Sequence, residues 1–424
     1  MKKSRIIPGR TSVDTPRHLP LVDLLVDART ELFELAVRSG LKVLETMLED
    51  DRAALCGPRY VHGTDRQAMR AGTVPSAVVL GGRKVAIQRP RVRAGGREVA
   101  LPTFQAMADA DPLNRRVVEQ MLVGVATRRY ARSLEPVPAS MRSRGTSKSA
   151  VSRRFVAKTA AQLTAWQTAS LDGLDLVGLL IDGVHVGEHC LIVALGIAAD
   201  GQKHALGLWD GSTENARVCQ DLLANLQSRG LRTDRSVLVI LDGSKALRKA
   251  VRTVFGEAAL VQRCQVHKTR NILEYLSERD RPWAHALLRR AYQTADPKLA
   301  QRLLLDLAKR LEHEYPSAAE SVREGLDETL TVLTLKLSPR LRRSLATTNA
   351  AESLISRTRL VKRNVKRWRG GQMMLRWVAA GVLEAVKGFR RLKGYADMPA
   401  LVSALRARDR QLGLGERQED RQVA

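Results

Sequence analysis

Aromatic and acidic residues are both scarce in this chain of 424 residues. Phe, Trp and Tyr make up only 4% of it, so its core must rest on Leu, Val, Ala and Ile. Asp and Glu total 44 against 71 Lys and Arg, which gives a formal net charge of +27. An excess of this size attracts a polyanion, and nucleic acid is the usual one. Ribosomal and membrane-surface proteins are equally basic, so charge alone does not decide between these classes.

Long apolar runs and paired cysteines are also missing. The longest apolar stretches, such as LDLVGLLID at residues 174–182, fall short of the roughly 20 residues that span a bilayer. No apolar segment of a signal peptide follows the basic N-terminus. Cys56, Cys190, Cys219 and Cys264 lie too far apart for a disulfide framework or a paired CxxC zinc pattern. We therefore expect a protein of the reducing cytoplasm that has no membrane partner.

Hydrophobic periodicity divides the N-terminal part into three regions. Residues 1–75 form a helical region, because apolar residues recur at three- and four-residue spacing over 20–55. Residues 76–110 form a small β element, in which apolar and polar residues alternate between glycine pairs. Residues 111–168 hold two helices with a polar turn, a pattern that resembles a helix-turn-helix DNA-binding unit. Any basic helical hairpin has a similar pattern.

Basic side chains are concentrated in the last two of these regions. In the β element they make either a solvated edge that resists aggregation or a set of contacts to a DNA backbone. On the second helix of the pair, they would face a phosphate backbone or a major groove. Ser147 or Ser149 would cap that helix. The basic residues are Arg83, Lys84, Arg89, Arg91 and Arg93 in the β element, and Lys148, Arg153 and Arg154 on the helix.

The rest of the chain is an α/β segment followed by helices. Over residues 169–266, a buried strand leads into a hairpin with Asp200-Gly201 at its turn, and then a helix, a strand, a helix and a strand follow. This order is typical of an RNase H-like core, so the fold class is α/β. Residues 267–345 form an all-α insertion in that core. Residues 346–395 complete the core, and residues 396–424 form a C-terminal tail.

Two aspartates end apolar strands of the α/β segment: Asp182 in GLLIDG and Asp242 in LVILDG. An aspartate at the end of a buried strand is costly unless metal ions or basic partners offset its charge. Carboxylates in such a place can hold two Mg²⁺ ions, which activate the attacking oxygen and stabilise the leaving oxygen of a phosphodiester. The alternative is that each Asp-Gly pair merely begins a turn.

Six segments resemble, in the same order, the Mutator-type transposases of bacterial insertion sequences, which are DDE transposases. The segments are LLIDGVHVGE, LGIAADGQKHALGLWDGSTENA, LLANLQSRGL, VILDGSKALRKAV, VQRCQVHKTRNIL and LATTNAAESL. QRCQVHKTRN and TTNAAES are the most specific of them. The resemblance implies an RNase H-like fold, a catalytic triad at Asp182, Asp242 and Glu352, and two Mg²⁺ ions, for which Mn²⁺ substitutes.

Only the resemblance distinguishes Glu352 from an ordinary helix-capping glutamate. TTN begins a helix with Thr348 or Asn349 as its N-cap, so Glu352 lies in the first turn, where a carboxylate is favoured. Arg359, two turns along the same face, matches a basic position of the family and would bind a DNA phosphate near the metals. Ala351 departs from the family pattern, which usually has Ile before the Glu.

Further residues match blocks of the family without a settled role. Cys264 and His267 form a Cys-x2-His signature, which is half of a zinc site and is better explained by packing between core and insertion. Lys268 and Arg270 beside them are expected to contact DNA. Other matched or neighbouring residues are Trp209 and Glu214, with Glu214 ranking below the triad, and His185, His189 and Cys190 as partners for a zinc ion.

Residues and resemblance together predict a transposase that binds terminal inverted repeats and target DNA. Water and then a DNA 3′-hydroxyl would attack phosphodiesters, without a covalent protein–DNA intermediate. Two DNA ends must be held together, so we expect a homodimer or larger assembly on DNA, associated with the bacterial nucleoid. The alternatives are a non-catalytic DNA-binding regulator, which needs no such triad, and an RNase H-like nuclease, which only the resemblance separates from a transposase.

Overall fold

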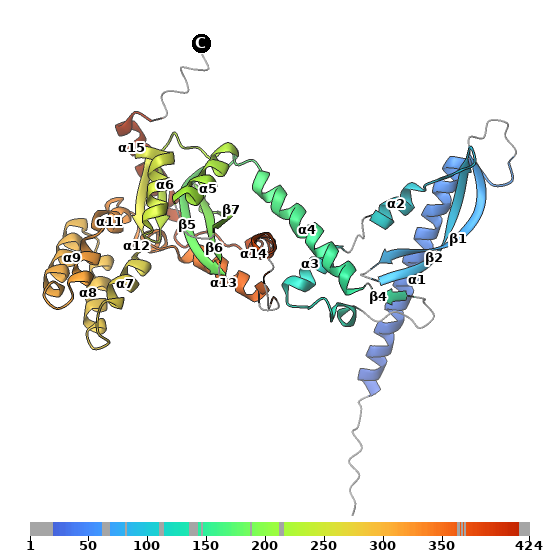
Figure 1. Ribbon diagram of the computed structural model, residues 1–424, viewed down its shortest axis with the longest axis horizontal. Coiled ribbons are helices and arrows are strands. Elements are labelled where there is room, and N and C mark those ends of the chain that lie inside the picture. Colours follow the sequence, from blue (N-terminus) through green and yellow to red (C-terminus); the bar gives the residue numbers. More distant parts are fainter. Residues whose placement is uncertain are drawn as a thin grey trace, which may run out of the picture. The chain divides into compact units, whose positions relative to one another are not determined.

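The computed structural model describes residues 20–61, 68–80, 83–109, 114–134, 143–145, 147–186, 189–211, 216–362, 365, 368 and 370–414. The described chain is mixed α/β and forms two compact units (Figure 1). The first comprises Met1–Val117 and Arg128–Ala150, and the second comprises Val118–Thr127 and Val151–Ala424. No described helix is long and apolar enough to cross a membrane.

In the first unit, a long helix packs on one face of a four-stranded antiparallel sheet. The helix predicted over 20–55 is confirmed. The sheet begins before the predicted residue 76, because a bulge between Arg70 and Thr73, with Gly72 at φ +76°, interrupts the alternation that marks a strand. The elements are α1 (Pro20–Cys56), β1 (Met69–Leu80), β2 (Arg83–Ala94), β3 (Arg97–Val99), α2 (Pro102–Asp109) and β4 (Ser143–Gly145).

The two helices predicted over 111–168 are present, but they are separated by much more than the predicted polar turn. Helices α3 (Asn114–Leu122) and α4 (Lys148–Thr168) are separated by residues 123–147, which include β4 and a 3-10 turn. A helix-turn-helix has a turn of about three or four residues. The Ser147 hydroxyl does cap α4, because it accepts a hydrogen bond of 3.3 Å from the amide of Ala150. DNA binding by this region stays a prediction.

A five-stranded mixed sheet forms the centre of the second unit, in the order β7-β6-β5-β8-β9. Strands β7, β6 and β5 pair antiparallel, whereas β5, β8 and β9 pair parallel. The predicted order of strands and helices is confirmed, with the hairpin turn at Asp200-Gly201, where Gly201 has φ +80°. The elements are β5 (Leu176–Val186), β6 (His189–Ala198), β7 (Lys203–Gly211), α5 (Ala216–Ser228), β8 (Val237–Leu241), α6 (Lys245–Phe255) and β9 (Ala259–Arg263).

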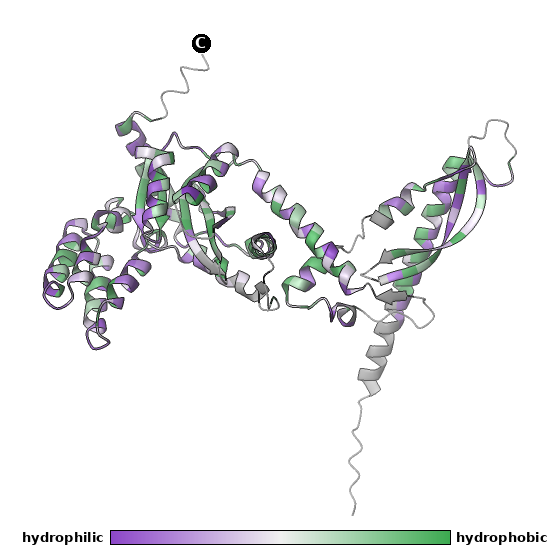
Figure 2. Cartoon of the chain, in the orientation of Figure 1, coloured by the Kyte–Doolittle hydropathy of each residue, from purple (hydrophilic) through white to green (hydrophobic). Residues whose placement is uncertain are grey.

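Both faces of this sheet are buried. Side chains alternate between the faces of a strand, so Leu179 and Ile181 pack with α5 and α6, while Leu180 packs with α4 and with helices from the end of the chain. Every residue of β8 is buried, as its uninterrupted VLVIL sequence requires. Figure 2 shows this concentration of hydrophobic residues on β5 and β6.

Residues 267–345 are helical, as the periodicity predicted, and they have a hydrophobic cluster of their own. Proline lies at the first or second position of four of these helices, where its missing N–H costs no hydrogen bond. The helices are α7 (Gln265–Glu274), α8 (Arg281–Gln293), α9 (Pro297–Leu311), α10 (Pro316–Arg323), α11 (Leu326–Thr334) and α12 (Pro339–Leu345).

The last helices return to the sheet. They are α13 (Asn349–Lys362), α14 (Gly371–Val386) and α15 (Met398–Leu412). The predicted C-terminal tail over 396–424 is wrong for α15, because Met398, Leu401 and Leu405 are buried in the core. The Asp409 carboxylate also accepts a hydrogen bond of 2.6 Å from the amide of Ser236, next to β8. The three- and four-residue spacing of the buried residues is the signal that marks this helix.

Candidate active site

The parallel pairing of β5 and β8 places Asp182 and Asp242 side by side. Ile181 is the partner of Leu241 in this ladder, and the residue that follows each of them is an aspartate. Both aspartates therefore lie just past the same end of the parallel pairing. Neighbouring strands lie about 4.8 Å apart. The residues that precede the aspartates, Ile181 and Leu241, face the side of the sheet that α5 and α6 cover. Because successive side chains of a strand alternate between faces, both carboxylates are directed to the opposite face of the sheet.

The two Asp-Gly pairs have different local structures. Asp242 does begin a turn: its carboxylate accepts a hydrogen bond of 2.9 Å from the amide of Ser244, which caps α6. Gly243 has φ +110°, and a Cβ there would lie 2.7 Å from the Arg263 guanidinium, so the position needs glycine. Asp182, in contrast, lies inside β5, which continues to Val186. The turn alternative is therefore wrong for Asp182, which is only 4% exposed.

Glu352 belongs to the helix that covers the face to which both aspartates are directed. It lies in the first turn of α13, where its amide donates to the carbonyl of Thr348 at 3.0 Å. The neighbouring Ala351 and Leu354 are buried in the same cluster as Leu180 of β5. The packing of α13 therefore brings the Glu352 backbone to the aspartates' side of the sheet.

Cys264 and His267 connect β9 to the start of α13. The buried Cys264 sulfur accepts hydrogen bonds from the amide and hydroxyl of Thr348, at 3.4 and 3.5 Å. The Thr348 hydroxyl also lies 3.4 Å from His267 Nδ1. His267 Nε2 in turn lies 3.3 Å from Glu352 Oε1. The Cys-x2-His signature thus contacts Thr348 and reaches Glu352, and its packing role between core and insertion stays a prediction.

The imidazole of His267 is positively charged and lies near the carboxylates of Asp182 and Glu352. Its hydrogen bond with Cys264 is the main cause that raises its pKa to about 9, and the charges of Asp182 and Glu352 raise it further against the effect of burial. Burial alone would raise the pKa of the Cys264 thiol, but hydrogen bonds with His267 and Thr348 lower it below its ordinary value. Because both carboxylates act on one imidazole, Asp182 and Glu352 share an electrostatic environment.

One oxygen of Glu352 is suited to a metal ion. Oε1 is buried and accepts no hydrogen bond, and the His267 imidazole, 3.3 Å away, offsets only part of its charge. Carboxylate oxygens are also the ligands that Mg²⁺ prefers. Among the described residues, no three Asp, Glu, His or Cys side chains are gathered closely enough to hold a metal. The fit to Mg²⁺ therefore rests on this oxygen and on the chemistry of the three carboxylates.

Lys268, a predicted DNA contact, lies inside the protein. It is 3% exposed, and its ammonium donates a hydrogen bond of 2.6 Å to the carbonyl of Glu324 at the end of α10. Burial is the main cause that lowers its pKa to about 8. Arg263, which sequence reasoning missed, donates 2.9 Å to the same carbonyl. Both cations stabilise a helix C-terminus, and the DNA contact of Lys268 stays a prediction.

The other predicted site residues are spread over the chain. Among the predicted DNA contacts, Arg270, Lys148 and Arg153 are exposed and Arg154 is half-buried. Trp209 packs beside α5, and Cys190 is buried. The side chains of Arg359, Glu214, His185 and His189 lie outside the described residues, as does that of Arg83.

The most specific sequence block, QRCQVHKTRN, joins the sheet to the helices. Gln262 is fully buried; its amide nitrogen donates to the carbonyl of Thr329 at 2.8 Å, and its oxygen accepts from the amide of Val332 at 2.8 Å. With Arg263 and Cys264 it ties the end of β9 to α11 and α13. The run QRCQ at the end of β9 is the sequence signal for such a connection. Only the fold reveals which residues these side chains contact.

Known proteins identify the family to which these features belong. The model of the family "Transposase, Mutator family" matches residues 25–391. The chain belongs to this family. This confirms the resemblance of its sequence blocks to that family.

Three relatives are insertion-sequence transposases. The transposase for IS6120 of Mycolicibacterium smegmatis is 32% identical over 213 residues, 49% of this chain and 64% of the relative. A probable transposase of Corynebacterium diphtheriae is 33% identical over 48% of this chain and 60% of its own length. This chain thus spans less than two thirds of either relative. The transposase for ISRM5 of Rhizobium meliloti is 26% identical over 89% of this chain and 94% of its own length.

Proposed function

We propose that this Mutator-family transposase cleaves and joins DNA strands with Asp182, Asp242 and Glu352 as its catalytic triad. The observation that carries the proposal is the register of β5 and β8, which sets two aspartates side by side under the helix of Glu352. The family's order of blocks adds support, because it assigns the same three residues. A DNA-binding regulator has no need of this arrangement.

An RNase H-like core accounts best for the second unit. Three antiparallel strands followed by two parallel ones, with helices between them and on both faces, support this fold. The helices α7 to α12 then form an insertion between β9 and α13. Asp242 lies at the carboxyl end of β8, and Asp182 lies beside it within β5, just past the end of the parallel pairing.

The three carboxylates would hold two Mg²⁺ ions, or Mn²⁺ in their place, which would supply Lewis acidity to both reacting oxygens. The chain's own residues prepare this site. Asp242 is oriented by its hydrogen bond from the Ser244 amide. Glu352 is held beside the charged imidazole of His267, which offsets part of the negative charge. The protein forms no covalent bond to DNA. A water oxygen attacks phosphorus as the bond to the 3′-oxygen breaks, which leaves a 3′-hydroxyl and a 5′-phosphate. The 3′-hydroxyl then loses its proton and attacks a phosphorus of the target strand as the target's own bond to its 3′-oxygen breaks, which releases a 3′-hydroxyl of the target.

The first unit would recognise the terminal inverted repeats. Lys84 and Arg93 are exposed on β2, so they are free to contact phosphates. Arg89 and Arg91 instead pair with Glu98 at 2.7 and 3.0 Å, which makes them part of a solvated edge. Holding two DNA ends together requires a dimer or larger assembly on DNA.

The test replaces Glu352 with Gln, which keeps the size of the side chain and its helix propensity. We expect cleavage and joining of DNA carrying the element's own ends to fall about 1000-fold or more in Mg²⁺, while DNA binding is retained. Glu320→Gln, the same change at an exposed residue of α10, is the matched control. Wild-type activity in Glu352→Gln would remove Glu352 from the triad. Wild-type cleavage without joined products would favour the nuclease.

A further inference from the structure

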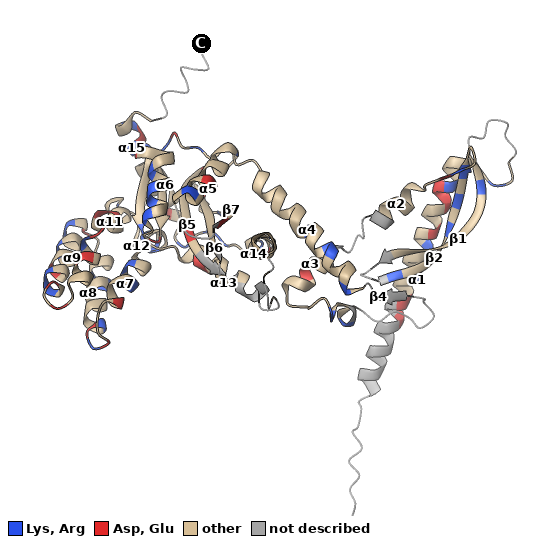
Figure 3. Ribbon diagram, viewed as in Figure 1, with Lys and Arg blue, Asp and Glu red and all other residues tan. Residues whose placement is uncertain are grey.

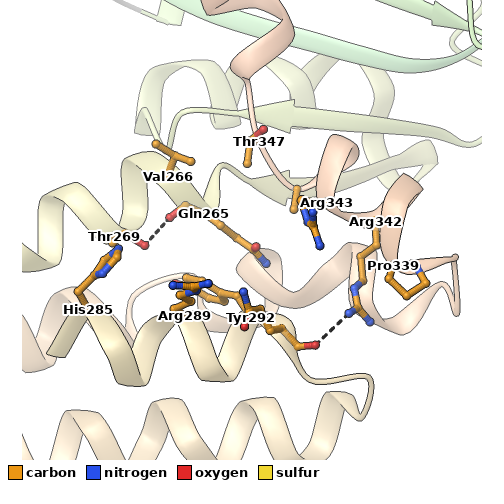
Figure 4. Close-up of a pocket in the computed structure, with 12 residues that line it drawn as sticks. Gln265, Val266, Thr269, His285, Arg289, Tyr292, Pro339, Arg342, Arg343 and Thr347 are labelled. Atoms are coloured by element: carbon orange, nitrogen blue, oxygen red, sulfur yellow. Dashed lines mark hydrogen bonds between the residues drawn. The ribbon is translucent and has the colours of Figure 1, made fainter. Parts of the chain in front are cut away.

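A basic cavity lies next to the segment that carries Glu352. Its volume is about 550 Å³, and it is lined by α7, α8, α12 and the residues that precede α13. Figure 4 shows Arg289 entering from α8 and Arg342 and Arg343 from α12, with Thr347 at the border. Figure 3 shows further basic residues along α7 and α8.

The charge in this cavity is not balanced by the residues around it. Three arginines and His285 line it, and none of the lining residues is acidic. The Arg342 guanidinium donates to the Gln293 carbonyl, at 3.2 Å, and both burial and the charge of Arg343 lower its pKa. Arg289 and Arg343 are exposed and have no hydrogen-bond or ion-pair partner within the described part of the chain. Uncompensated guanidinium groups in a concave site are suited to bind an oxyanion.

The cavity borders the backbone segment that leads into the helix of Glu352. The amide of Gln265, which lines the cavity, donates 2.9 Å to the carbonyl of Ala346. Thr347 also lines it, and the next residue, Thr348, contacts Cys264 and His267. An anion in the cavity would therefore lie beside the backbone that leads into the Glu352 helix.

We propose that this cavity binds a backbone phosphate of the DNA strand that enters the carboxylate site, with Arg289 and Arg343 as its main contacts. The inference rests on the proposed function, because that function makes DNA the polyanion present at this edge. Arginine pairs with phosphate oxygens through two parallel N–H donors, so two arginines from different helices can fix the position of the strand. His285 and Arg342 add positive charge without being required as contacts.

The test compares two double variants of the full chain that remove the same charge. Arg289→Gln/Arg343→Gln removes the proposed phosphate-binding groups. Arg290→Gln/Arg340→Gln changes exposed arginines of the same two helices that do not line the cavity. The probe is a duplex carrying the element's own end, and binding is measured against salt concentration. We expect the cavity variant to lower the salt slope by about 1 for each phosphate that it no longer neutralises, and the control variant to change it much less.

Ethylation interference then identifies the phosphate. Ethylation at one or two phosphates near the cleaved bond should block DNA binding by the wild type and by the control variant. The same ethylation should not weaken DNA binding by the cavity variant. Equal slopes and an unchanged interference pattern in both variants would overturn the proposal. A different result would overturn the proposed function: a wild type that does not cleave this DNA in Mg²⁺. A reduced salt slope of the cavity variant would still support phosphate binding in the cavity of a protein that does not cleave.

Discussion

The two sheets of this protein differ in how many of their faces are buried. In the first unit, Val85, Ile87 and Val92 of β2 are buried, while Lys84 and Arg93 on the same strand are exposed. In the second unit β8 is buried throughout, with helices on both faces of the sheet. A sheet that helices cover on both faces is held by packing from two sides, and this packing brings α13, which carries Glu352, onto the sheet. A sheet buried on one face keeps the other free for a partner.

The largest effect is expected from Asp182. Asp182→Asn should reduce strand cleavage about 1000-fold or more, since the three carboxylates act as one unit. Combining it with Glu352→Gln should add little further loss. The Asn side chain fits the same space, so thermal stability should be unchanged or slightly higher once a buried negative charge is removed. Cleavage assays and thermal unfolding are measured together, with exposed Asp306→Asn as control. Additive losses would show that the carboxylates act independently.

The next effect concerns the packing of the buried sheet. Leu180→Ala should lower the free energy of unfolding of the second unit by about 2–5 kcal/mol, because Leu180 is fully buried. All five tryptophans lie after residue 150, so Trp fluorescence in urea follows the second unit. Val78→Ala, a buried change in the first unit, should leave that transition in place. A shift of equal size in both variants would mean that the two units unfold together.

Lys268 provides a pH-dependent test of the joint between sheet and helices. Burial lowers its pKa to about 8 from the ordinary 10.5. Between these values the folded chain binds fewer protons than the unfolded chain, so its contribution to stability rises with pH across this window. Lys268→Met should remove a rise on the order of 2 kcal/mol, measured by urea unfolding at about pH 7 and about pH 10. Exposed Lys249→Met should keep the rise. An unaltered rise in Lys268→Met would mean that the ammonium is solvated in the folded chain.

The smallest effect on stability is expected on the exposed face of the first sheet. Lys84→Gln/Arg93→Gln should change stability by less than about 0.5 kcal/mol. The salt slope of DNA binding should nevertheless fall by about 1 for each phosphate that the variant no longer neutralises. Arg89→Gln/Arg91→Gln, which removes the pairs with Glu98, is the comparison. If the Arg89 and Arg91 variant reduces the slope more, the DNA-binding residues lie at that edge instead.

The sequence predicted those parts whose signal is local. The periodicity of α1, the element order from β5 to β9 and the Asp200-Gly201 turn follow from residues close together in the chain. The family match, now confirmed, came from short blocks in order. The errors lie where the local signal is interrupted or weak. They are the start of β1, where the bulge at Gly72 interrupts the pattern, the polar turn expected between α3 and α4, and α15, which packs where a tail was expected.

The candidate site shows most clearly what the sequence determined and what only the tertiary structure decided. The sequence by itself determined which residues are predicted to carry the chemistry, because Asp182 and Asp242 end apolar runs and Glu352 lies in a family block. Only the tertiary structure decided that β5 and β8 are parallel neighbours, and that Thr348 joins Cys264 and His267 to Glu352. The same is true of the cavity shared by α8 and α12. All three features have the same physical cause. Pairing and packing between segments that are distant in the sequence depend on which faces are buried together, and a local sequence pattern does not contain that information.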